Sequence, residues 1–288
     1  MLFRSVRQHI AAGGTAAVLE EHIRGHMITL YEGGTHLPLL WTHLIPATLE
    51  GRAMHNVQNA MFAATMAHAM GVKHENIRQG LRTFDTTFFQ APGRLNVYDK
   101  LPFKVILDYG HNPAAMKAMA DLVRRLDVAG RRIGVISAPG DRRDEDIAEI
   151  ARHAGGAFDH LILRSDTDLR GRKPDAVPRL LAGALLEAGV PASRFEIIVD
   201  EVAAVDAALA HGRPGDLLVI FGDQLTRTWK QIIYYDAGEA SLALVTPPVD
   251  DRSPVLVPQR ATEGELGASG LTLIADERGV RLARETDD

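Results

Sequence analysis

Short apolar runs alternate with longer amphipathic segments between Leu95 and residue 234, and this alternation limits the possible folds more than any other feature. The strand-like runs are Leu95–Tyr98, Phe103–Leu107, Arg132–Ser137, His160–Leu163, Phe195–Val199 and Leu217–Phe221. Helices are expected over 113–127, 144–154, 174–188, 201–210 and 223–234. Such βα alternation with short connections predicts an α/β fold with a mostly parallel, Rossmann-like sheet covered on both faces. The first two runs are joined by so few residues that they are expected to pair as an antiparallel hairpin.

One strand–turn–helix segment, residues 105–113, carries polar residues where ligands usually bind. The strand ends at Asp108, Asn112 is suited to cap the next helix, and Pro113 suits its first position. Asp108 and His111 are therefore expected at the carboxyl edge of the sheet, where open α/β sheets bind ligands. The alternative is a simple βα corner with a capping asparagine.

The first half of the chain predicts a different organisation. Residues 16–20, 26–31 and 36–40 read as short strands, and residues 56–70 read as a buried helix rich in Ala and Met. Asn56 and Asn59 lie three residues apart near the start of this helix, so their amides share one face. Paired amides suit a flat polar ligand such as a purine. The alternative is that Asn56 caps the helix and Asn59 is unrelated.

Composition excludes several functional classes. The net charge is -5, so no basic field favours nucleic acid. Cysteine is absent, which excludes disulfides and thiolate metal sites. No apolar run approaches the roughly 20 residues of a membrane span. We therefore expect a soluble cytoplasmic protein without a membrane or nucleic-acid partner, and a homo-oligomer is compatible with the sequence.

Five motifs in order carry a family resemblance that covers roughly residues 10–236. Residues 51–60 (GRAMHNVQNA), 92–94 (PGR) and 108–113 (DYGHNP) together resemble the Mur ligase family. Residues 139–147 (PGDRRDEDI) and 215–230 (GDLLVIFGDQLTRTWK) are similar to the cyanophycin branch of that family. Each motif is weak alone, but their order and spacing make the set specific.

The resemblance implies an ATP-dependent ligase that joins a carboxylate to an amine. In the family, ATP phosphorylates the carboxylate, and the amine attacks the resulting acyl phosphate. In the cyanophycin branch, arginine is added to the side-chain carboxylates of an aspartate backbone. The partners implied are ATP, an amino acid that is arginine in this branch, and a polymeric or peptide carboxylate.

The resemblance also implies roles for individual residues. Asn56 and Asn59 are expected at the adenine, with His55 beside them. Arg94 is expected to reach the nucleotide phosphates, Asp108 to accept from the ribose, and His111 to line the same corner. The nucleotide-binding set is therefore His55, Asn56, Asn59, Arg94, Asp108 and His111. On charge alone, a substrate-binding loop is proposed at Asp141, Arg142 and Asp144.

The chain departs from the family in a part that binds ATP. Family members bind ATP phosphates with a loop ending Gly-Lys-Thr/Ser, and this sequence contains no Gly-Lys pair. We therefore expect residues 1–90 to be the end of a central ATP-binding domain, 91–238 a C-terminal Rossmann-like domain, and 239–288 an extended tail with a hairpin near 271–283. The phosphate loop and the magnesium ligands are expected upstream, with no metal site in the chain, so the chain is not expected to be an independent catalyst.

Two other readings remain open. One is that the chain belongs to another Mur ligase type that acts on muramyl peptides or folylpolyglutamates. The other is that it forms a non-catalytic nucleotide-binding or interaction module. A nicotinamide-dependent oxidoreductase is disfavoured because the first βα turn carries no Gly-x-Gly-x-x-Gly.

Overall fold

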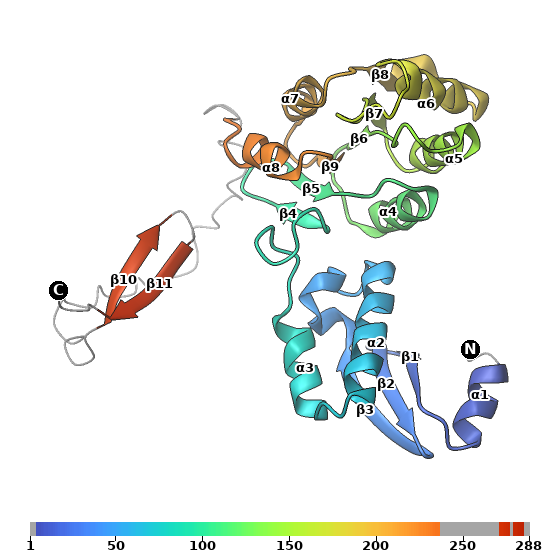
Figure 1. The fold of residues 1–288 in the computed structure, drawn as a ribbon, viewed down its shortest axis with the longest axis vertical. Helices are drawn as coiled ribbons and strands as arrows, with labels where there is room; N and C mark the ends of the chain where they lie inside the picture. The colour runs from blue at the N-terminus through green and yellow to red at the C-terminus, as the bar shows by residue number, and fades with distance from the viewer. Residues whose placement is uncertain (1–3, 237–270, 277–278, 285–288) are drawn as a thin grey trace, which may run out of the picture. The chain divides into compact units, whose positions relative to one another are not determined.

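A six-stranded sheet organises the second half of the chain (Figure 1). The computed structural model describes residues 4–236, 271–276 and 279–284. The strand order is β4-β5-β9-β6-β7-β8, with bounds β4 Asn96–Tyr98, β5 Lys104–Asp108, β9 Leu217–Phe221, β6 Arg132–Ile136, β7 His160–Leu163 and β8 Phe195–Ile197. β4 pairs antiparallel with β5, and the other neighbours pair parallel. The predicted α/β fold with a mostly parallel sheet and one antiparallel hairpin is confirmed.

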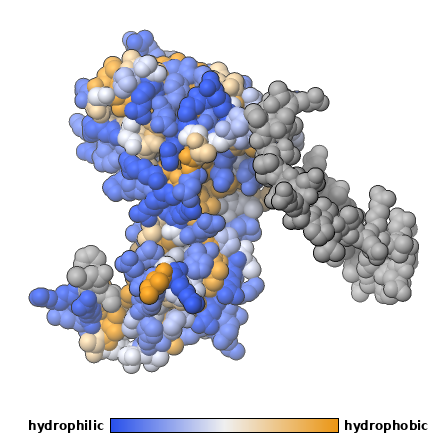
Figure 2. All heavy atoms as spheres, turned by 180° about the vertical axis from the view of Figure 1, so that it is seen from behind, coloured by the Kyte–Doolittle hydropathy of each residue, from blue (hydrophilic) through white to orange (hydrophobic). Residues whose placement is uncertain are grey.

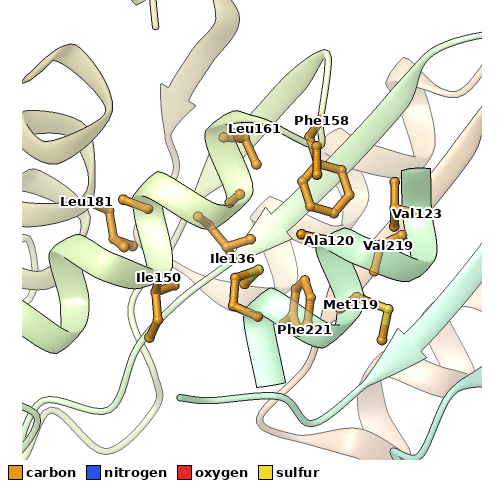
Figure 3. Packing of buried hydrophobic residues seen from close by; sticks show 14 of the residues in the cluster. Met119, Ala120, Val123, Ile136, Ile150, Phe158, Leu161, Leu181, Val219 and Phe221 are labelled. Carbon is orange, nitrogen blue, oxygen red and sulfur yellow. The ribbon is translucent and has the colours of Figure 1, made fainter. Parts of the chain in front are cut away.

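Helices cover both faces of this sheet. Residues of α4 (Pro113–Arg125), α5 (Asp144–Gly155) and α6 (Ala176–Glu187) share one core with the sheet, part of which Figure 3 shows. Residues of α7 (Glu201–His211) and α8 (Leu225–Ile233) share a second core with the other face. Alternate residues of β9, such as Val219 and Ile220, enter opposite cores. A strand buried on both faces must be apolar throughout, which explains the continuous run at 217–221.

The helix that follows β5 begins as the sequence predicts. The Asn112 side chain accepts a hydrogen bond from the backbone N–H of Ala115 at 2.9 Å, and Pro113 is the first helical residue. This cap fixes the turn that carries His111.

The start of the helix that follows β9 is held by a side chain of another helix. Gln224 holds the N-cap position of α8 without a side-chain cap bond. The buried carboxylate of Glu201, the first residue of α7, instead accepts from the backbone N–H groups of Asp223 at 2.8 Å and Gln224 at 3.3 Å. Thr228 and Arg227 also donate to it, at 3.2 and 2.9 Å. A cap supplied from another helix leaves no local sequence signal.

The first half of the chain contains a small antiparallel sheet packed against two helices. Its strands are β1 Ala16–His22, β2 Gly25–Glu32 and β3 Thr35–Trp41, and its helices are α2 Met54–Ala69 and α3 His74–Thr83. Two short 3-10 helices, Thr42–Leu44 and Pro46–Thr48, connect the sheet to α2, and a third, Ala192–Arg194, precedes β8. Ile28, Leu30, Ala64 and Ile77 lie in the shared core. The helix α1 Arg4–Ala11, which has no buried residue, was not expected from the sequence.

A carboxylate in the small sheet is strongly hydrogen-bonded. Glu20 accepts from the hydroxyls of Thr29 and Tyr31 at 2.7 and 2.6 Å, and His36 lies 3.2 Å away. Burial works to raise the pKa of Glu20, but these hydrogen bonds outweigh it and lower the pKa to about 2. The same contact with Glu20 raises the pKa of Tyr31 to about 12.

The linker between the two halves, residues 84–95, is fixed to the six-stranded sheet. The Asn96 side chain donates to the carbonyl oxygens of Thr86 and Ala91, both at 2.8 Å, and accepts from Gly93 N at 2.7 Å. Phe88 stacks on Trp229 of α8 with ring centroids 5.0 Å apart. The linker is thus held against the sheet domain from Thr86 to Gly93.

The chain divides into two compact units, Met1–Pro247 and Pro248–Asp288. In the second unit, β10 (Leu271–Asp276) pairs antiparallel with β11 (Gly279–Arg284). On the face drawn in Figure 2, mostly hydrophilic residues cover the first unit, with smaller hydrophobic patches between them. No helix among the described residues has the length and apolar character needed to cross a membrane.

Candidate functional site

An apolar cleft of about 560 Å³ lies between α2, α3 and the linker. Small side chains of α2 form much of its wall, and both predicted amides and the predicted arginine line it. Its lining consists of Ile45, Ala47, Asn56, Asn59, Ala60, Ala63, Ala64, Ala67, Val72, Asn76, Ile77, Gly80, Leu81, Phe84, Thr86, Ala91 and Arg94. A narrow wall of alanines suits a flat ring, and the amides supply hydrogen bonds for its edge.

The two amides of α2 interact with each other. Asn59 Nδ2 donates to Asn56 Oδ1 at 3.2 Å, and Asn56 Nδ2 donates to the carbonyl oxygen of Ala47 at 2.7 Å. Asn56 is not the helix cap, because α2 begins at Met54 with Ala53 as its N-cap residue. The alternative in which Asn56 caps the helix is therefore wrong. Asn59 is exposed, and its side-chain oxygen accepts no hydrogen bond within the described part of the chain.

Arg94 reaches the same cleft from the sheet side. Its guanidinium is exposed and donates no hydrogen bond to any described residue, so its donors remain available to a ligand. The preceding Gly93 has a φ of +69°, a conformation that glycine adopts without strain. Tyr109 N donates to Gly93 O at 2.8 Å, which attaches this turn to the end of β5.

Asp108 and His55 form a half-buried electrostatic pair next to this turn. Asp108 accepts from Leu95 N at 2.9 Å and from Gly110 N at 2.7 Å. Burial raises the pKa of Asp108, and these two N–H groups, with the charges of His55 and Arg94, oppose that rise. Burial lowers the pKa of His55, and the charge of Asp108 opposes that fall. Neither residue lines the cleft, but Asp108 interacts electrostatically with Arg94, which does.

A second, polar hollow of about 80 Å³ lies at the carboxyl ends of β5, β6, β7 and β9. His111 lines it, and its Nδ1 lies 2.9 Å from the carbonyl oxygen of Tyr109. Of the predicted substrate-binding residues, Arg142 lines it. Three carboxylates, Asp166, Asp168 and Asp223, share the lining with Arg164 and Arg170. This position, at the carboxyl edge of a parallel sheet, is the usual ligand position in open α/β folds.

A buried arginine forms part of this hollow. Arg164 donates through Nη2 to the carbonyl oxygen of Phe221 at 2.6 Å and through Nη1 to that of Ser165 at 2.8 Å. Its Nη2 lies 3.6 Å from Glu201, and its Nε has no hydrogen-bond partner among the described residues. Burial raises the pKa of the neighbouring Asp166. A hydrogen bond from Ser137 at 2.5 Å and the charge of Arg164 oppose this rise.

The two acidic residues proposed as substrate ligands are paired with arginines of the chain itself. Asp141 bonds Arg170 at 2.5 Å, and Asp144 bonds Arg172 at 2.8 Å. Arg172 also donates to the carbonyl oxygen of Gly140 at 2.6 Å. These bonds join the loop after β6 to the loop after β7, and neither Asp141 nor Asp144 lines the polar hollow.

The sequence interpretation did not select Asp166, Asp168, Asp223 or Arg164 as site residues. All four lie within a few residues of the carboxyl end of β7 or β9. Their position directly after a strand could therefore have identified them from the sequence. Loop charge, which led to the selection of Asp141, could not.

Comparison with known proteins supports the motif resemblance. Residues 93–224 match the Mur ligase glutamate ligase domain. This part of the chain is therefore similar to the Mur ligase family. Over 237 residues the chain is 38% identical to the cyanophycin synthetase of Trichormus variabilis, a match that covers 79% of this chain and 24% of that protein. It is 30% identical over 172 residues to the UDP-N-acetylmuramyl-tripeptide synthetase of a Roseiflexus species, covering 58% of this chain and 32% of that protein.

A solved structure supports the same fold. FolC of E. coli in complex with ADP and without folate superposes with a TM-score of 0.53 at 21% identity, covering 76% of this chain and 46% of that chain. The chain thus has a Mur ligase domain and is similar to cyanophycin synthetases, and it spans about a quarter of the length of the curated cyanophycin synthetases it matches.

Proposed function

We propose that this chain supplies the base-binding and amine-binding parts of an ATP-dependent carboxylate–amine ligase of the cyanophycin synthetase type. The observation that carries the proposal is that Asn56, Asn59 and Arg94 line one cleft, although Arg94 is separated from the amides by α3 and the linker. Similarity to cyanophycin synthetases supports this reaction class over the muramyl-peptide type.

The residues of the cleft fit a nucleotide. The alanine wall of α2 receives the base, Asn59 bonds the edge of the base, and Arg94 attracts the phosphates. Asn56 holds Asn59 in position, since it already bonds both Asn59 and the Ala47 carbonyl oxygen. When bound, ATP supplies the phosphoryl group that activates the carboxylate substrate. Magnesium ligands and the Gly-Lys-Thr/Ser loop are proposed to come from outside this sequence, so the chain alone is proposed not to turn over ATP.

The polar hollow is proposed to bind the amino acid that is added. Asp166, Asp168 and Asp223 give it three carboxylates, which suit a cationic side chain such as that of arginine. Asp141 and Asp144 are proposed to hold the hollow's loops together through Arg170 and Arg172, which modifies the charge-based hypothesis for that loop.

Nucleotide binding tests the first half of the proposal. Isothermal titration of the chain with ADP is expected to give an affinity that Arg94→Ala lowers roughly 10- to 100-fold, the range for losing a charge-assisted hydrogen bond. Asn59→Ala is expected to lower the affinity several-fold. Arg82→Ala is the matched control, since Arg82 is exposed on α3 and lies outside the cleft lining. Equal ADP affinity in the Arg94 and Arg82 variants would contradict the proposed cleft.

Incorporation of arginine tests the second half. A longer protein that contains this sequence and a Gly-Lys-Thr/Ser loop is expected to add arginine to an aspartate polymer only with ATP. Asp223→Asn is expected to raise the KM for arginine while leaving the ADP affinity unchanged. If the longer protein binds ADP but incorporates no amino acid, the alternative of a non-catalytic nucleotide-binding module is favoured.

A further inference from the structure

Two histidines and a glutamate converge on the edge of the sheet opposite the polar hollow. His160 is the first residue of β7, Glu196 lies in β8, and His211 is the last residue of α7. His160 Nε2 lies 3.1 Å and His211 Nε2 lies 3.0 Å from the same atom, Glu196 Oε1. Within the described residues, no other group of three His, Asp or Glu side chains brings its ligand atoms this close together.

The fold itself places these three side chains on one face. Glu196 pairs in register with Ile162, and alternate strand residues share a face, so His160 and Glu196 both lie on the Ile162 side of the sheet. Ile162 packs in the core that α7 covers, and α7 ends at His211 on that side. Sheet register and helix length therefore bring the three residues together on one face.

The geometry points to a binding site for a divalent transition metal, and we propose that His160, Glu196 and His211 bind Zn²⁺. Zinc takes imidazole nitrogen and carboxylate oxygen at about 2.0–2.2 Å, so tetrahedral ligands lie about 3.3–3.5 Å apart. The Nε2–Oε1 separations of 3.0 and 3.1 Å need only a small outward shift to admit the ion. Two histidines and one glutamate are an established zinc ligand set, with the fourth position left to water.

Two features of the surroundings favour a cation at this position. His211 ends α7, and the C-terminal end of a helix carries partial negative charge. The three side chains are 23–46% exposed, so an ion can enter from solvent without opening the core. The site lies at the opposite strand ends from the polar hollow, so it would join β7, β8 and α7 rather than take part in the ligase reaction.

Metal titration of the full chain tests the proposal. After chelator treatment and dialysis, ZnCl₂ is titrated calorimetrically into the wild type, Glu196→Gln, His211→Ala and the control His153→Ala. His153 has a single glutamate neighbour, Glu149, at 3.4 Å and lies outside the cluster. Gln retains a hydrogen-bond acceptor for both imidazoles but is a poor zinc ligand, so Glu196→Gln separates metal binding from local packing.

The expected result is one zinc equivalent in the wild type and in His153→Ala that is weakened at least tenfold in Glu196→Gln and His211→Ala. Saturating Zn²⁺ is expected to raise the Tm of the wild type by roughly 5 °C or more, and to leave the Tm of Glu196→Gln nearly unchanged. The proposal is overturned if the wild type binds no zinc, or if all four proteins bind it with the same affinity and stoichiometry. Either result would identify the cluster as a hydrogen-bonded His–Glu–His group without a metal.

Discussion

Replacement of Glu201 by alanine is expected to be among the most destabilising single changes in the six-stranded domain. Glu201 is 3% exposed, and its carboxylate accepts from the backbone N–H groups of Asp223 and Gln224, which immediately precede α8. In the alanine variant, Asp223 N and the buried hydroxyl of Thr228 lose their acceptor. Arg164 loses one of its two carboxylate neighbours and keeps Asp166 at 3.4 Å.

The magnitude follows from these losses. Each buried donor left unpaired costs about 1–3 kcal/mol, and a buried ion pair that loses one partner costs about 3–5 kcal/mol. Arg164 keeps two carbonyl acceptors, so its share is reduced, and the total decrease in unfolding free energy is expected at about 3–5 kcal/mol. That corresponds to a fall in Tm of roughly 6–20 °C for a domain of this size.

Urea unfolding followed by circular dichroism measures the effect, with Glu187→Ala as control. Glu187 also lies in a helix, at the end of α6, but is exposed. Its replacement is expected to change the unfolding free energy by no more than about 0.5 kcal/mol. If Glu201→Ala lies within 1 kcal/mol of the Glu187 control, the carboxylate does not cap α8 in the way described.

Three further changes test other parts of the structure. Gly93→Ala is expected to lower the unfolding free energy by about 2–4 kcal/mol, because φ is +69° and the new Cβ would lie 2.6 Å from Leu225 Cδ1. Thermal unfolding measures this change, and an unchanged Tm would contradict the described conformation of Gly93. Gly140→Ala is expected to speed amide hydrogen exchange in the loops after β6 and β7, because the new Cβ would collide with the Leu169 carbonyl oxygen. Unchanged exchange would show that these two loops do not touch there. Glu20 has a pKa lowered to about 2, so its stabilising effect is complete above its unfolded pKa and is lost as pH falls from about 4.5 towards 2. Urea unfolding at pH 5 and 2.5 is therefore expected to show the wild type losing about 1 kcal/mol more than Glu20→Gln, after allowance for solvent screening; parallel losses would argue against the lowered pKa.

The sequence predicted the sheet domain well because its signals are local. Each buried strand is a continuous apolar run, and the Asn112–Pro113 cap lies within one helical turn of the bonds it makes. The cap of α8 was missed because its acceptor, Glu201, lies 22 residues away from Asp223. A bond between distant elements depends on how helices pack, which a local pattern does not record.

The candidate site shows the same division. The amides of α2 were recognisable because residues three apart share a helix face, and their shared cleft with Arg94 agrees with that pattern. Asp141 and Asp144 were singled out for charge alone, and the structure pairs both with arginines about 30 residues further on. Loop charge in a sequence does not distinguish a carboxylate that faces a ligand from one that binds its own chain.

The fixed linker has a consequence for how a ligase of this type would close. Because Asn96 and Trp229 hold Thr86 and Phe88 against the sheet, any pivot between the two halves must lie upstream of residue 86. Arg94 would then move as a rigid part of the six-stranded sheet domain, while α2 with its two amides would not. A nucleotide bound between them would connect the two parts, with its phosphates at Arg94 and its base at α2.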